Sequence, residues 1–171
     1  MRNYAIVITL LTRENLPTTC NLEIKVAIWK GGCLCGAIRY EASVSESENL
    51  YCHCRMCQRW TGSVVAVSAI IPKLDLKITQ GEPKYFQSSG FVQRGFCQDC
   101  GSPMFFRPIK DEDDWVAVQT GTLDDPELAP PVGHYGVEGR ISWLKIKDDL
   151  PCERTEDDEW FLKRSSEQNH K

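Results

Sequence analysis

Apolar and polar residues alternate along most of the chain with the period of two that predicts β-strands. Ile38, Tyr40 and Ala42 alternate with small or polar neighbours, so a strand with one buried face is expected there. Residues 63–71 are largely β-branched and apolar on both faces, which is typical of a buried strand, and Pro72 ends it. Further strands are expected at residues 74–78, 91–96, 104–107, 115–120 and 141–147.

Helical signals are scarce by comparison. Residues 153–165 are expected to form a weak helix, with Thr155 and Asp158 as its capping box. Residues 148–159 contain seven acids and one arginine, which is typical of a solvated face or tail. The pattern as a whole predicts one mainly-β domain over residues 27–152, with flexible ends.

Length and charge narrow the function classes. The 171 residues correspond to one domain of ordinary size. Twenty lysines and arginines against 24 aspartates and glutamates give a net charge of −4, so charge does not support nucleic-acid binding. The longest stretch without a charge, residues 60–72, is shorter than the ~20 residues that cross a bilayer. We therefore expect neither a nucleic-acid nor a membrane partner.

The N-terminus has the outline of a secretory signal, because Arg2 precedes an apolar run at residues 4–11. However, that run is short, Arg13 and Glu14 follow it at once, and no small-residue cleavage site appears. An ordinary strand or a disordered extension is the preferred interpretation. A cytoplasmic location is then expected, and its reducing conditions leave thiols available for metal.

Nine cysteines are present, and seven of them fall in three tight clusters. Clustered cysteines favour a metal site over a disulfide framework. Cys33 and Cys35 are expected to point to one face of a strand, and Cys97 and Cys100 have the spacing of a zinc knuckle. Two such pairs predict a closed, structural four-sulfur zinc site; two unlinked pairs of core or redox cysteines are the alternative. Cys20 and Cys152 lie outside these clusters, and we do not expect them to bind metal.

The middle cluster, Cys52, Cys54 and Cys57, offers only three sulfurs, and a short helical turn is expected to follow its second cysteine. Three protein ligands are the usual sign of a catalytic zinc with an open position. Three thiolates give this ion a soft character that suits a thiol or thiol adduct, whose pKa the metal would lower. The alternative is a second structural site closed by His53 or His134. Since His53 lies between two ligands, we expect it to point away from the metal.

Four segments carry a family resemblance: residues 31–40, 52–62 and 94–103, and a C-terminal signature of His134, Trp143 and Leu150-Pro151. Together they resemble the glutathione-dependent formaldehyde-activating enzyme family, which also includes centromere protein V. The resemblance covers residues 29–151, leaving residues 1–28 as an extension and residues 152–171 as an acidic tail or short helix. It implies a β-tent of small antiparallel sheets and two zinc ions per chain. The implied structural ligands are Cys33, Cys35, Cys97 and Cys100, and the implied catalytic ligands are Cys52, Cys54 and Cys57.

The activity that the resemblance implies is the reversible addition of glutathione to formaldehyde, which gives S-(hydroxymethyl)glutathione and makes the protein a carbon–sulfur lyase. The metal would hold the thiolate near the aldehyde or polarise the aldehyde oxygen. His134 is the candidate for proton transfer, with a structural hydrogen-bonding role as the alternative. A non-catalytic zinc-stabilised binding module is the competing hypothesis for the whole protein.

Overall fold

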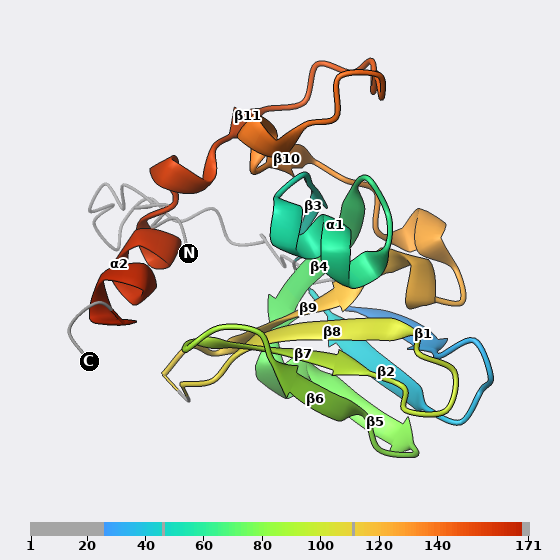
Figure 1. Cartoon of the computed structure of the whole chain (residues 1–171). Helices are drawn as coiled ribbons and strands as arrows, with labels where there is room; N and C mark the ends of the chain where they lie inside the picture. Colours follow the sequence, from blue (N-terminus) through green and yellow to red (C-terminus); the bar gives the residue numbers. More distant parts are fainter. Residues whose placement is uncertain (1–25, 46, 111, 169–171) are drawn as a thin grey trace, which may run out of the picture.

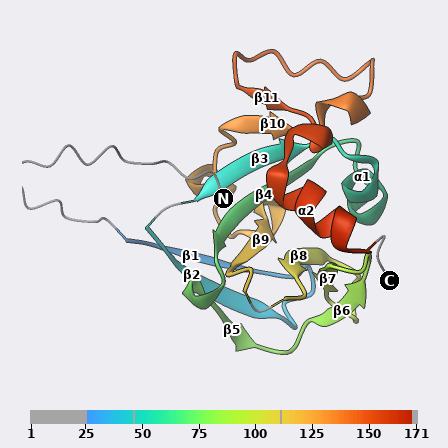
Figure 2. The ribbon, with the colours of Figure 1, turned by 90° about the vertical axis from the view of Figure 1, so that its left-hand side faces the viewer.

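The computed structural model describes residues 26–168 apart from residues 46 and 111, so the expectations for the N-terminal extension and Cys20 lie outside the described residues. A small antiparallel sheet has the order β1-β2-β5. Its strands are β1 (Ala27–Gly32), β2 (Arg39–Val44) and β5 (Leu76–Gln80). Figure 2 shows this sheet along the bottom of the molecule, below β8 and β9 of a larger sheet.

The larger sheet has eight strands in the order β11-β10-β3-β4-β9-β8-β7-β6, which Figure 1 shows from top to bottom. Its strands are β3 (Glu48–Cys52), β4 (Ala66–Pro72), β6 (Lys84–Gln87), β7 (Val92–Phe96), β8 (Pro103–Pro108), β9 (Trp115–Gln119), β10 (Gly133–Tyr135) and β11 (Cys152–Glu153). All neighbours are antiparallel except β10, which runs parallel to β3 and β11.

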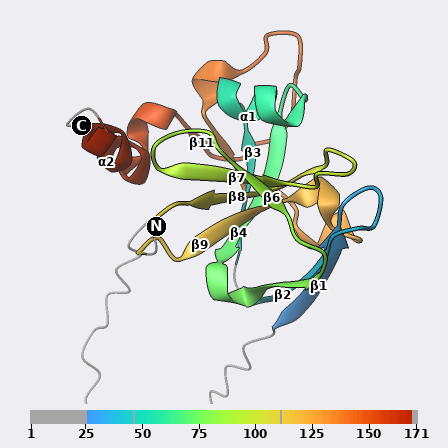
Figure 3. The ribbon, with the colours of Figure 1, turned by 60° about the horizontal axis from the view of Figure 1, so that its bottom comes forward.

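Helix is limited to α1 (Arg55–Thr61), α2 (Glu159–Gln168) and short 3-10 turns among the described residues. These turns are η1 (Lys73–Asp75), η2 (Thr120–Thr122), η3 (Pro126–Leu128), η4 (Val137–Gly139) and η5 (Thr155–Asp157). Figure 3 shows α1 and α2 on the opposite side of β7, β8 and β9 from β1 and β2. The two helices therefore flank the outer face of the large sheet.

The C-terminal helix is present but differs from its prediction. It begins at Glu159, and the Asp158 carboxylate accepts a hydrogen bond from the Phe161 amide at 3.1 Å, as an N-cap does. Thr155 does not complete the expected capping box, because its hydroxyl donates to Glu138 at 2.6 Å and Thr155 itself lies in η5.

The main core lies where the two sheets face one another. Tyr40 of the small sheet packs edge-on against Phe105 of the large sheet, with ring centroids 5.3 Å apart. The Tyr40 hydroxyl lies 2.8 Å from the Thr122 hydroxyl, which satisfies its polar atom inside the core. Ile71 and Val118 are buried in the same cluster. This packing explains why alternate positions of these strands are apolar.

The mainly-β prediction is confirmed, with one clear error among the predicted strands. Residues 141–147 alternate in polarity but form no strand, and Trp143 is 71% exposed. Among the residues that the structure describes, no strand pairs with this segment. Residues 74–78 are divided between η1 and β5. Among the described residues, no helix has the length and apolar character needed to cross a bilayer.

Candidate metal and active sites

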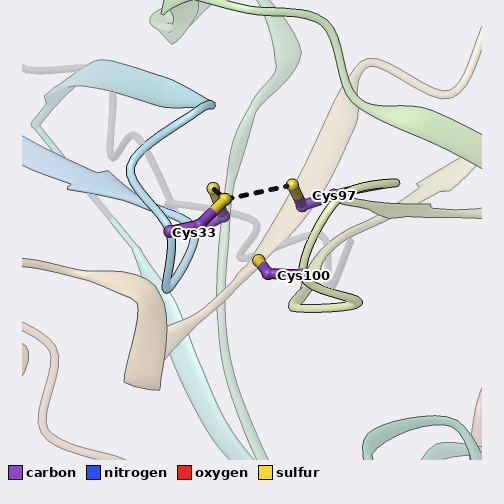
Figure 4. A group of neighbouring side chains, drawn as sticks. Cys33, Cys97 and Cys100 are labelled. Atoms are coloured by element: carbon purple, nitrogen blue, oxygen red, sulfur yellow. Dashed lines mark hydrogen bonds between the residues drawn. The ribbon is translucent and has the colours of Figure 1, made fainter.

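The first cysteine cluster joins two turns that are far apart in sequence. Cys33 and Cys35 lie in the turn after β1, and Cys97 and Cys100 lie in the turn after β7. The expectation that the first pair lies on a strand is wrong, because β1 ends at Gly32. Figure 4 shows the sulfurs of Cys33, Cys97 and Cys100 converging on one point between these turns.

The spacing of these four sulfurs fits a tetrahedral zinc ion. All four lie within 4.8 Å of one another, with 3.5 Å between Cys33 and Cys35 and 3.9 Å between Cys35 and Cys97. Sulfurs about 2.3 Å from a zinc ion in a tetrahedron are about 3.8 Å apart. The cluster is therefore preorganised for a closed four-sulfur site.

Backbone and hydroxyl donors surround the same cluster. The Ile38 amide donates to the Cys33 sulfur at 3.2 Å. The Ser102 hydroxyl accepts from the Leu34 amide at 3.0 Å and lies 3.2 Å from the Cys100 sulfur. Hydrogen bonds from Ser102 lower the pKa of Cys100 to about 6. These contacts favour the thiolate form that binds metal.

The second cluster forms where β3 runs into α1. Cys52 ends β3, the Cys54 side chain caps α1 by accepting from the Cys57 amide, and Cys57 lies in the first turn. The three sulfurs lie within 4.8 Å of one another, and 3.5 Å separates Cys52 from Cys54. Among the described residues, no histidine, aspartate, glutamate or further cysteine joins them at that distance. The chain thus offers three ligands here and leaves one side open.

A buried arginine lies against this second cluster. Arg94 of β7 is 2% exposed, and its guanidinium lies 4.9 Å from the Trp60 ring centroid and 4.8 Å from that of Phe106. Its Nε donates to the Ser88 hydroxyl at 3.0 Å, and its two terminal nitrogens lie 3.7 and 3.8 Å from the Cys57 sulfur. The sequence pattern assigned Arg94 no role, although a charged residue in phase with the apolar Val92 and Phe96 was a usable signal.

The charge state of Cys57 follows from these neighbours. Hydrogen bonds from the thiols of Cys52 and Cys54, together with the nearby Arg94 guanidinium, lower the pKa of Cys57 to about 3. The same crowding of sulfurs raises the pKa of Cys52. A divalent metal that binds here would displace the protons of the Cys52 and Cys54 thiols, while Cys57 is already a thiolate.

His134 and His53 lie behind the sulfurs. Alternation along β3 puts Leu50 and Cys52 on one face of the sheet and Tyr51 on the other, and His134 pairs with Tyr51 and stacks on its ring. The His53 Nε2 atom lies 2.9 Å from Nδ1 of His134, and both rings are buried. His53 therefore points away from the metal ligands, as its position between two of them predicts.

The open side of the three-cysteine cluster faces a cleft of about 590 Å³. Its floor comes from β3, β4, β7, β8 and β9, and its sides come from α1, β10 and the C-terminal segment. All three clustered cysteines line one end. Six aromatic side chains also line it: Phe91, Phe106, Trp115, Tyr135, Trp160 and Phe161. The cleft accommodates a molecule far larger than formaldehyde.

Cys152 lies apart from both clusters. It is exposed in β11, and its sulfur lies 3.2 Å from a terminal nitrogen of Arg140. No group of metal-binding side chains includes it among the described residues.

Comparison with known proteins gives one family and several partial relatives. The family model of the glutathione-dependent formaldehyde-activating enzymes matches residues 28–138. A Schizosaccharomyces pombe protein named "Uncharacterized lyase" is 33% identical over 78 residues, which are 46% of this chain and 56% of that protein. A Phaeosphaeria nodorum protein named "Putative glutathione-dependent formaldehyde-activating enzyme" is 31% identical over 90 residues, 48% of this chain and 47% of that protein.

The chain spans about half the length of the curated relatives it matches. Among solved structures, a Rhodobacter sphaeroides protein is similar with a TM-score of 0.47 and 19% sequence identity. That similarity covers 72% of this chain and 98% of the other.

Proposed function

Since the chain belongs to the glutathione-dependent formaldehyde-activating enzyme family, we propose that it is a zinc-dependent carbon–sulfur lyase. The reaction is the reversible addition of a thiol, in the first instance glutathione, to formaldehyde. The matched residues 28–138 include all seven clustered cysteines. The observation that carries the proposal is the three-cysteine cluster, which lacks a fourth protein ligand among the described residues and opens into a cleft of about 590 Å³.

The residues present fit two zinc ions, and they divide as the cysteine spacing predicts. Cys33, Cys35, Cys97 and Cys100 would hold a structural ion, and Cys52, Cys54 and Cys57 would hold an ion with one exchangeable position. When bound in the open site, zinc lowers the pKa of a thiol and polarises a carbonyl.

The protein's own groups hold the reactants and the charge. The reaction forms a carbon–sulfur bond, while the thiol proton passes to the former carbonyl oxygen. Hydrogen bonds from Cys52 and Cys54, together with the buried Arg94 guanidinium, keep the Cys57 sulfur in its thiolate form. Tyr135 and Asp158 line the cleft as a hydrogen-bonded pair, with the Tyr135 hydroxyl donating at 2.8 Å, so they offer polar contacts to the substrate.

His134 fits an orienting role better than proton transfer. It belongs to the opposite face of the sheet and does not line the cleft. His134 forms a hydrogen bond with His53, and His53 stands in the sequence between Cys52 and Cys54, two of the proposed zinc ligands. We therefore assign His134 to fixing the Cys52–Cys54 segment, as outer-sphere partners of metal ligands do.

An open metal cluster in a large cleft favours an enzyme over a non-catalytic zinc module. The test is proton NMR exchange spectroscopy of formaldehyde and glutathione, with and without zinc-loaded protein. We expect exchange between the adduct and its components to be faster when the protein is present. The Cys152→Ser variant is the control and should also accelerate exchange. The Cys54→Ser variant should match the uncatalysed rate. No acceleration by fully zinc-loaded protein would overturn the proposal. A cytoplasmic location stays a prediction.

A further inference from the structure

The cleft beside the three-cysteine cluster has a continuous aromatic wall. Phe106 contacts the Arg94 guanidinium and stacks on Trp115, with ring centroids 5.7 Å apart. Trp115 meets Trp160 edge-on at 5.1 Å, and Trp160 meets Phe91 at 5.6 Å. Since Arg94 itself reaches the Cys57 sulfur, this chain of rings runs from the metal ligands to α2.

The far end of this wall is firmly fixed although it belongs to the C-terminal segment. The Trp160 indole nitrogen donates to the Asp113 carboxylate at 2.8 Å. Arg164, one turn further along α2, is 3% exposed and pairs with Asp113 at 2.7 Å and with Glu112 at 2.9 Å. The two cleft-lining rings of α2, Trp160 and Phe161, are therefore held in place by charged contacts behind them.

These α2 residues lie outside the part of the chain that the family model matches, which ends at residue 138. The cleft wall thus combines the shared domain with a segment that the family model does not include. The family match alone therefore does not predict a specificity feature that uses α2.

The charges along the cleft disfavour an anionic ligand near α2. Acids lining the cleft are Glu48, Glu138, Glu153 and Asp158, against two arginines, Arg55 and Arg94. Arg94 already faces Cys57, and Arg55 hydrogen-bonds to Gln58. The two carboxylates of glutathione find little complementary charge here, whereas an uncharged ring finds six aromatic neighbours.

We propose that the wall formed by Phe91, Phe106, Trp115, Trp160 and Phe161 is a subsite for an aromatic group of the substrate. This inference rests on the proposed lyase function and specifies its substrate class: a thiol–aldehyde adduct that carries an aryl group. In its formation the sulfur bonds to the carbonyl carbon, the carbon–oxygen π pair moves to oxygen, and the thiol proton follows it there. Breakdown reverses each change. The aryl group can come from the thiol or from the aldehyde.

The test measures thiol binding to the full chain loaded with cobalt, by its sulfur-to-metal absorption. Phenylmethanethiol should bind about tenfold more tightly than 2-mercaptoethanol, because it buries a ring in addition to the sulfur. In a second arm, glutathione with phenylacetaldehyde is compared with glutathione and formaldehyde. A preference in the first arm assigns the ring to the thiol, and one in the second assigns it to the aldehyde.

Variants of α2 locate the effect. Phe161→Ala and Trp160→Ala should reduce the phenyl preference, the ratio of the two thiol affinities, to about threefold or less. Leu162→Ala is the matched control, because Leu162 is the next residue, is 49% exposed and does not line the cleft. Trp160→Phe keeps a ring and should retain most of the preference even if Trp160→Ala loosens α2.

Benzyl alcohol, which has the ring but no thiol, separates the two proposals through quenching of tryptophan fluorescence. If benzyl alcohol binds but thiols leave the cobalt absorption unchanged, the lyase function is overturned and the aromatic subsite is retained. Equal affinities for phenyl and non-phenyl ligands in both arms, or a preference that survives both Phe161→Ala and Trp160→Ala, would overturn the subsite.

Discussion

The Nε2 atom of His53 lies 2.9 Å from Nδ1 of His134, and Nε2 of His134 lies 3.0 Å from the Asp148 carboxylate. This chain of hydrogen bonds begins between Cys52 and Cys54 of the three-cysteine cluster and ends at the surface, since Asp148 is exposed. Both imidazoles are 3% exposed or less, so each depends on the other for a buried hydrogen bond. The pair therefore links the metal-binding segment to β10.

The first prediction concerns zinc content and stability in His134→Ala. Because we assign His134 an orienting role and neither possible ligand group includes it, the variant should keep both zinc ions. It should lose about 1–3 kcal/mol of stability, since His53 is left with an unsatisfied buried nitrogen. Elemental analysis and urea unfolding of zinc-loaded protein measure the two effects. Asp148→Asn is the control, because it keeps a hydrogen-bonding side chain beside His134. Loss of one zinc ion from His134→Ala would instead make it a ligand.

A second prediction is that His53 stays neutral far below the usual histidine range. Burial, then the nearby charges of Arg140 and His134, lower its pKa from 6.5 to about 4. A depressed histidine pKa means that the unfolded chain takes up the proton first. The contribution of neutral His53 to stability is therefore intact above pH 6.5 and declines as pH falls toward 4. In NMR titration of zinc-loaded protein, the His53 ring signals should not shift between pH 8 and 5.5. His53→Gln identifies those signals, and a midpoint near 6.5 would contradict the prediction.

An alternating segment forms a strand only where a neighbouring strand is available to pair with it. Residues 40–44 alternate and lie in β2, which is paired with β1 on one side and β5 on the other. Residues 141–147 also alternate over much of their length, but no strand pairs with them in the part of the chain that the structure describes. Alternation shows which side chains share a face, but a strand also needs a partner that satisfies its backbone hydrogen bonds. Whether such a partner strand is available depends on the fold of the whole chain.

The two cysteine clusters could be predicted from sequence because short spacings keep sulfurs close in any fold. The meeting of Cys35 with Cys97, 62 residues away, was also expected, because a four-sulfur site needs both pairs of cysteines. The aromatic wall could not be predicted in this way. Phe91 and Trp160 meet through packing of α2 against the sheet, and no local spacing encodes that contact.

A third prediction separates the structural cluster from the isolated cysteine. Cys97 is fully buried in the core, and its substitution by serine removes a proposed zinc ligand from the cluster that joins two distant turns. Since zinc binding in peptide sites is worth about 10–16 kcal/mol, Cys97→Ser should unfold or be poorly soluble. Cys152→Ser should keep full zinc content and the same melting temperature. Circular dichroism with elemental analysis measures both, and a stable, fully zinc-loaded Cys97→Ser protein would contradict the ligand assignment.

A fourth prediction concerns the open cluster. Cys54→Ser replaces a soft ligand with a poor one, so this variant should lose one zinc ion and keep its fold through the other cluster. Its helix cap should survive, because a serine hydroxyl also accepts from the Cys57 amide. Competition with a chelator should show one labile and one slowly released ion in the unsubstituted protein, and only the slow one in Cys54→Ser. Two labile ions, or complete unfolding of the variant, would oppose this division of roles.

The last prediction tests what holds α2 against the cleft. Arg164 is buried, and it pairs with the Asp113 carboxylate, which is itself buried and whose pKa its contacts lower. Removing one partner of a buried ion pair leaves the other charge uncompensated and costs about 3–5 kcal/mol. In Arg164→Ala that cost falls on the docked state of α2, so hydrogen exchange of amides 159–168 should accelerate strongly. Lys163→Ala, at an exposed position on the same helix, should change stability by less than about 0.5 kcal/mol. Slow exchange retained in Arg164→Ala would mean that the Trp160 contacts with Phe91 and Trp115 suffice to hold the helix.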